Sequence, residues 1–215
     1  MTPLAALKID RDRPDARAID RAAEVIRRGG IVLIPTETLY GFAADPWNAN
    51  AVARIIAIKR RADDKGMPVL VGDLEFAHRL ARGISPSAEQ LIEQHWPGAL
   101  TIVVAAHPLL PREVAPDGVA LRWTACPAAA ALASAAGGAI TATSANRSGD
   151  TRPALDPDLI AAEFGSAIDL ILDAGPLPPS LPSTVVDGRT DPPVVLRAGA
   201  VRIGPLFGQL PTDRG

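Results

Sequence analysis

Basic side chains that could bind phosphate are concentrated in the segment IKRRADDKG, residues 58–66, which contains Lys59, Arg60, Arg61 and Lys65. A triphosphate is bound well by several cationic donors, and arginine adds bidentate geometry. Cations at the end of a helix are also favoured by the helix dipole, so a solvated helix end is the simpler explanation. The charges alone therefore leave both interpretations open.

A single arginine, Arg122, interrupts the otherwise apolar segment VALRW at 119–123. An arginine in a buried strand is costly to desolvate unless an anion pairs with it. That anion is either an internal Asp or Glu, or the carboxylate or phosphate of a ligand. A third interpretation places the strand at the edge of its sheet. The sequence of this segment is consistent with all three interpretations of Arg122.

Hydroxyl-rich sequence follows three further apolar segments. Two of these segments carry more than one Thr or Ser residue: PTETLYG at 35–41 and AITATSANRSGD at 139–150. In the third, Ser183 and Thr184 begin one strand of an expected hairpin and Arg197 ends the other. Backbone amides and hydroxyls in such loops bind phosphate in many proteins, and ligands of α/β domains collect at strand ends. Ser, Asn and Gly are also ordinary turn residues, and an arginine beside hydroxyls also braces a hairpin.

Alternating helical and strand patterns place these segments in an α/β domain. We expect helices over 15–28, 50–60, 73–83, 85–97, 127–136 and 156–164. We expect strands over 31–34, 67–71, 100–104, 118–123, 138–143 and 169–172, and an antiparallel hairpin of 183–187 and 193–197. The result is a twisted, mixed parallel and antiparallel open sheet flanked by helices. It occupies 15–204, between an N-terminal arm, 1–14, and a C-terminal tail, 205–215.

Composition excludes several classes of protein. The net charge of −2 argues against a protein coated in positive charge, and the single cysteine, Cys126, excludes an internal disulfide or a thiolate metal cluster. His78, His95 and His107 lack metal-ligand spacing, and neither the P-loop nor the Rossmann fingerprint is present. No apolar stretch is long enough for a membrane span, so we expect a cytoplasmic protein. From the cysteine and histidine patterns we expect no metal site of its own.

Seven short motifs, in order from about residue 15 to 204, resemble the YrdC/TsaC family of threonylcarbamoyl-AMP synthases. They are PTETLYG, the Lys59–Arg61–Lys65 cluster, WPGALTIVV, VALR, TSANRSG, PSTVVD and VLRAG. The resemblance implies a YrdC-like sheet with a concave, basic cavity that holds ATP and threonine. It also implies that the activity is nucleotidyl transfer, a step in tRNA modification.

Site roles are carried over from the resemblance position by position. Lys59 and Arg61 would be catalytic; Arg61, Lys65, Ser144, Asn146 and Arg197 would bind ATP; and Thr38, Arg122 and Ser183 would bind threonine. Mg²⁺ would accompany ATP. Four positions depart from the family pattern: Leu70 stands where longer members have a histidine, Gly66-Met67 replaces Pro-Leu, Trp123 replaces a smaller residue, and Ala198 replaces a proline.

The implied reaction needs no protein nucleophile. Threonine's amine captures CO2 or bicarbonate as a carbamate, whose oxygen attacks the α-phosphorus of ATP and expels pyrophosphate, while cations neutralise the phosphate charge. The product would donate its threonylcarbamoyl group to tRNA beside the anticodon, which makes tRNA and the tRNA threonylcarbamoyl-transferase complex expected partners. The main alternative is a non-catalytic RNA- or nucleotide-binding paralogue. A third possibility is a carbamoyl-adenylate-forming domain like that of hydrogenase-maturation proteins. Those proteins carry zinc-finger cysteines, which this sequence lacks.

Overall fold

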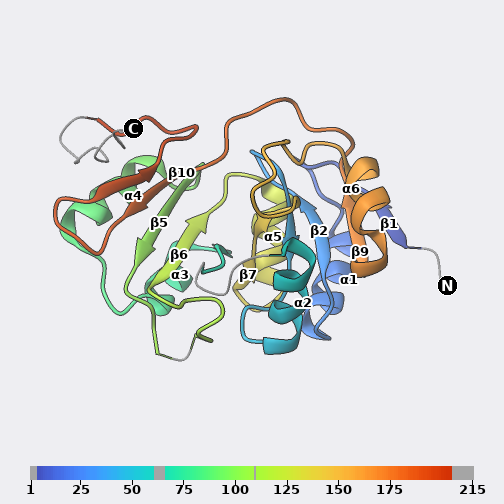
Figure 1. Ribbon diagram of the computed structural model, residues 1–215, viewed down its shortest axis with the longest axis horizontal. Coiled ribbons are helices and arrows are strands. Elements are labelled where there is room, and N and C mark those ends of the chain that lie inside the picture. Colours follow the sequence, from blue (N-terminus) through green and yellow to red (C-terminus); the bar gives the residue numbers. More distant parts are fainter. Residues whose placement is uncertain (1–3, 61–65, 109, 205–215) are drawn as a thin grey trace.

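In the computed structural model, which describes residues 4–60, 66–108 and 110–204, the strands form two sheets that lie side by side (Figure 1). The first sheet has the order β1, β9, β2, β3, β8. Its strands are β1 (Ala5–Lys8), β9 (Leu170–Asp173), β2 (Val32–Pro35), β3 (Tyr40–Ala43) and β8 (Thr143–Ser144). β9 pairs in parallel with β1 and β2, and the other pairs are antiparallel.

The second sheet has the order β11, β10, β5, β6, β4, β7. Its strands are β11 (Val194–Arg197), β10 (Thr184–Asp187), β5 (Leu100–Val104), β6 (Val119–Trp123), β4 (Val69–Val71) and β7 (Ala139–Thr141). The pairs β10–β5 and β4–β6 are parallel, and the other three are antiparallel. The expected α/β class and the terminal hairpin are confirmed, but the strands are divided between two sheets instead of one.

The helices surround both sheets. They are α1 (Ala16–Arg27), α2 (Ala49–Lys59), α3 (Leu74–Leu80), α4 (Pro86–His95), α5 (Pro127–Ala135), α6 (Pro157–Phe164) and the 3₁₀ turn Gly165–Ala167. Five begin at a residue whose side chain accepts a hydrogen bond from a first-turn amide, which satisfies a donor with no partner inside the helix. These N-caps are Asp15, Asn48, Asp73, Ser85 and Asp156. Within the described ranges, no helix is both long and apolar enough to cross a membrane.

Two features of the first sheet were not expected from the sequence. Residues 5–8, assigned to the N-terminal arm, form the edge strand β1, and the segment after Pro35 turns back as β3 instead of leaving the sheet as a loop. The expected strand 138–143 is also divided: β7 belongs to the second sheet and β8 to the first. Thr141 bonds to the Ala44 main chain, and Ala142 donates to the Pro68 carbonyl, so the chain changes sheets at these two residues.

The chain crosses between the halves again after β9. Residues 174–183 run from the first sheet to β10 of the second, along the top of Figure 1. On the way, the Ser180 hydroxyl donates to the carbonyl oxygen of Thr38 at 2.6 Å. This crossing segment is therefore tied to the turn between β2 and β3.

Candidate active site

A cavity of about 330 Å³ lies between the two sheets. Its polar lining consists mostly of hydroxyl groups and two guanidinium groups: Thr36, Thr38, Thr101, Thr143, Ser144, Ser183, Arg122 and Arg197. Among the described lining residues there is no Asp or Glu. A cavity of this size and charge suits a small ligand that carries carboxylate or phosphate groups.

One transverse row of the second sheet forms a wall of this cavity. Arg197 lies opposite Val185, Val185 opposite Thr101, and Arg122 opposite Leu70. The pairing of Ile102 with Leu121 puts Thr101 and Arg122 at the next opposed positions of β5 and β6. Opposed residues project from the same face of a sheet, and all five line the cavity. The strand register therefore places both arginines on one wall.

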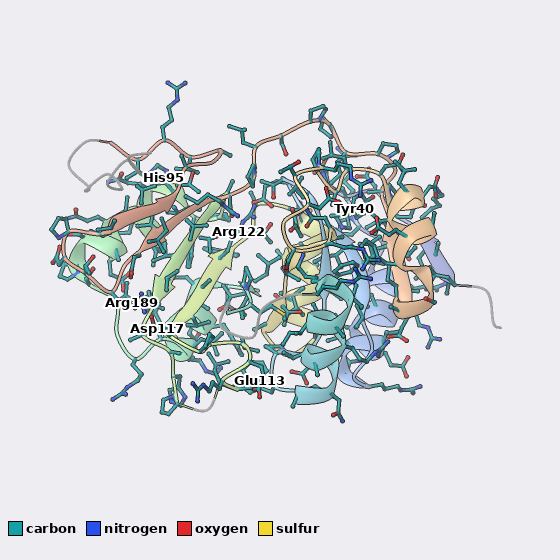
Figure 2. All side chains as sticks on the ribbon, in the orientation of Figure 1. Tyr40, His95, Glu113, Asp117, Arg122 and Arg189 are labelled. Carbon is teal, nitrogen blue, oxygen red and sulfur yellow. The ribbon has the colours of Figure 1, made fainter. Side chains whose placement is uncertain are left out.

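Arg122 lies between the two halves of the molecule (Figure 2), and its partner is the internal acid Glu37. The two charged groups approach to 2.7 Å, and the arginine side chain is only 9% exposed. Its Nε donates to the Gly98 carbonyl at 3.0 Å, and Nη1 donates to the Thr38 hydroxyl at 3.3 Å. Of the three interpretations left open by the sequence, the structure supports an internal counter-ion, with part of the guanidinium still facing the cavity.

Glu37 is not among the residues that line the cavity, but its carboxylate forms the ion pair with Arg122. Its carboxylate also accepts hydrogen bonds from the Thr124 hydroxyl at 2.5 Å and the Ala125 amide at 3.0 Å. Burial alone would raise the pKa of Glu37, but attraction to Arg122 and these hydrogen bonds outweigh it, so the pKa lies below its ordinary value of 4.5. Glu37 is thus an anion that belongs to the protein, and it joins the β2–β3 turn to the end of β6.

At the Arg197 end of the row, the Arg197 guanidinium is hydrogen-bonded to a pair of hydroxyl groups, those of Ser183 and Thr101, through Ser183. Ser183 Oγ and Thr101 Oγ1 are 2.9 Å apart, and Arg197 Nη2 donates to Ser183 Oγ at 3.2 Å and to its carbonyl at 2.9 Å. Partial burial of the guanidinium, and then the proximity of Arg122, lower the pKa of Arg197. Two like charges facing one cavity favour an anionic ligand between them.

Lys59, Ser144 and Asn146 meet at one loop, but only Ser144 lines the cavity. The buried Lys59 ammonium donates to the carbonyls of Ser144 and Asn146 at 2.5 and 2.6 Å. Asn146 accepts from the Ser144 hydroxyl and donates to the Asp150 carbonyl. Arg61 and Lys65, the other expected phosphate ligands, lie outside the described residues.

The Sua5/YciO/YrdC family model, described as telomere recombination, matches residues 24–199. The chain belongs to this family. It is 39% identical to the threonylcarbamoyl-AMP synthase of Halorhodospira halophila over 177 residues, which are 80% of this chain and 91% of that protein.

Two solved members of the Sua5/YciO/YrdC family extend the match to three dimensions. Pyrococcus abyssi Sua5, solved in complex with L-threonine, gives a TM-score of 0.83 at 35% identity over 92% of this chain. This chain spans only 58% of that longer protein. Escherichia coli YciO gives a TM-score of 0.87 at 28% identity and is covered over 99% of its length.

Two residues of the candidate site in this chain, Thr101 and Glu37, were not predicted from the sequence. Thr101 is a lone hydroxyl in the apolar strand LTIVV, and that isolation is the signal that could have indicated it. Glu37 was visible in PTETLYG but not as the partner of Arg122, because the pairing depends on the approach of two sheets. Of the positions that depart from the family pattern, Gly66 and Leu70 line the cavity. Leu70 is 2% exposed and puts an apolar side chain where the resemblance implies a histidine in longer members.

Proposed function

We propose that this chain is a nucleotidyltransferase that makes threonylcarbamoyl-AMP and pyrophosphate from ATP, L-threonine and bicarbonate. The observation that carries the proposal is the cavity wall with two arginines, neighbouring hydroxyls and no described acid. The relative from Halorhodospira halophila, which this chain matches over 91% of its length, bears the name of this activity.

The amino acid would bind at the Arg122 end. Its carboxylate would face Nη1 of Arg122, which now contacts the Thr38 hydroxyl, and Ser183 would lie on the opposite side. Glu37 is a partner of the guanidinium that belongs to the protein itself, so it would help to fix the position of Arg122 in the site. Binding there would keep the amine in a fixed position for carbamate formation.

The nucleotide would bind at the Arg197 end, with Ser144 facing its phosphates and Arg61 and Lys65 supplying further cations. In-line attack of the carbamate oxygen on the α-phosphorus requires positioning and charge neutralisation, not a protein nucleophile. Among the described residues, no group of three or more His, Cys, Asp or Glu side chains could hold a metal ion. Mg²⁺ would enter as part of the MgATP substrate.

The product would be used by enzymes that transfer the threonylcarbamoyl group to tRNA next to the anticodon, and we expect the protein in the cytoplasm with tRNA and that transferase complex as partners. Purified protein should be incubated with MgATP, labelled bicarbonate and one amino acid at a time. A labelled acyl-adenylate should appear with threonine only. Salt-sensitive RNA binding without any labelled adenylate would instead support the non-catalytic alternative.

A matched pair of variants tests the site within the same assay. Arg122→Met should lower kcat/KM for threonine roughly 10- to 100-fold, the loss expected for one charge-assisted interaction. Arg189 is the control, because it does not line the cavity. It pairs with Asp187 at the end of β10 and with Asp117 just before β6, away from Arg122 (Figure 2). Equal losses in Arg122→Met and Arg189→Met would contradict the proposed threonine site.

A further inference from the structure

The buried ammonium of Lys59 is directed at the main chain of a cavity loop. Lys59 is the last residue of α2 and is 2% exposed. Its Nζ lies 2.5 Å from the carbonyl oxygen of Ser144, 2.6 Å from that of Asn146 and 3.4 Å from Asn146 Oδ1. All three acceptors belong to the same short loop.

These contacts match what a buried ammonium requires. A lysine ammonium has three N–H donors, and removing it from water is costly unless they are hydrogen-bonded. Among the described residues, two main-chain carbonyls and one side-chain oxygen accept from this ammonium. The carbonyl oxygen of Lys59 also accepts from the Ser148 amide at 2.8 Å, so this residue holds the loop at both ends.

The loop that Lys59 holds presents Ser144 to the cavity. Ser144 pairs with Gly41 in the first sheet, and its hydroxyl donates to Asn146 Oδ1 at 2.7 Å. The Asn146 amide then donates to the Asp150 carbonyl at 2.9 Å. Lys59 itself is not among the described residues that line the cavity. Its ammonium contacts oxygen atoms of this loop instead.

We infer that Lys59 is a positioning residue that acts through residues 144–148, not a catalytic residue that contacts the phosphates. The kinetic consequence rests on the proposed function, because it assumes that Ser144 faces the nucleotide. The structural consequence does not, because the contacts between Lys59 and the loop are made by protein atoms alone. The two parts can therefore fail separately.

Hydrogen exchange of the ligand-free protein tests the structural part. In Lys59→Met, which removes the ammonium and keeps an unbranched chain, amides of residues 145–148 should exchange roughly 10- to 100-fold faster, because charge-assisted hydrogen bonds hold the loop closed. Exchange in β5 and β6 should not change. The control is Lys8→Met, since Lys8 is an exposed lysine paired with Asp173. Should Lys59→Met fail to fold by circular dichroism, Lys59→Gln, which retains two donors, takes its place under the same criterion.

Activity measurements complete the test. If the inference holds, the variant with faster loop exchange also shows a higher KM for ATP, while Lys8→Met matches the wild type in both. Unchanged exchange at 145–148 together with lost ATP binding would overturn the inference and indicate direct phosphate contact. A wild-type protein that makes no threonylcarbamoyl-AMP would refute the proposed function, and the exchange result would still decide the role of Lys59.

Discussion

The Glu37–Arg122 pair should contribute measurably to folding stability, and a double-mutant cycle can isolate that contribution. The perturbations are Glu37→Gln, Arg122→Met and the double variant, each measured by urea denaturation near neutral pH. The side chains are 21% and 9% exposed and their charged atoms are 2.7 Å apart. Breaking a fully buried pair costs about 3–5 kcal/mol and an exposed pair contributes about 0–1 kcal/mol. For this intermediate burial we expect a coupling free energy of about 2 kcal/mol.

The pH dependence of the same coupling has a defined sign. The pKa of Glu37 is lowered in the folded protein, so its stabilisation is fully present above pH 4.5 and is lost as the pH falls through the folded-state pKa. The coupling should therefore shrink when the cycle is repeated well below pH 4.5. The control is the pair Asp150–Arg152, also in contact at 2.6 Å, whose arginine side chain is 76% exposed, and its coupling should stay below about 1 kcal/mol. Additive effects of Glu37→Gln and Arg122→Met near neutral pH would refute the reasoning.

Two further predictions use residues that occur once in the chain. Tyr40 is the only tyrosine, and burial raises its pKa to about 12, so folded protein should show almost no phenolate absorbance at pH 10, where about half of an exposed tyrosine is ionised. Stability should then fall as the pH rises from about 10 towards 12, because only the unfolded chain loses this proton, and a midpoint near 10 under native conditions would contradict a buried phenol. Cys126 is the only cysteine, is 2% exposed and has its pKa raised to about 11 by burial, so a thiol reagent should label it slowly in native protein and at once in denaturant. Equally fast labelling in both conditions would contradict that burial.

The elements that sequence predicts well are those set by local chemistry. Asp15 and Asp73 cap helices where the pattern of charged and apolar residues indicated, and the apolar segment 100–104 is a strand throughout. β1 was missed because its four residues AALK carry no strand pattern and depend on pairing with β9. The division of 138–143 was missed because Thr141 and Ala142 find partners in two different sheets.

The candidate site was predictable in its parts and not in its connections. Arg122, Arg197, Thr38, Ser183 and Ser144 were noted as polar residues of strands and strand ends and received site roles from the family resemblance, and they line one cavity. Which anion faces Arg122, and which way Lys59 points, depend on segments that are distant in sequence. No local pattern specifies that the turn after β2 reaches the end of β6, so Glu37 could not be assigned to Arg122 from the chain alone.

The two arginines of the cavity differ in how much of their charge is already compensated, and this difference favours a direction of binding. Arg122 has a carboxylate against it, whereas Arg197 donates to the carbonyl and the hydroxyl of Ser183, which carry no formal charge. The field of the wall should therefore be more positive at the Arg197 end. The pKa of Arg197, lowered by burial and by Arg122, would rise again when an anion binds beside it, so binding relieves part of that cost. The more highly charged phosphates are expected at Arg197 and the singly charged carboxylate at Arg122, which is the order that brings an amine-derived carbamate between them towards the α-phosphorus.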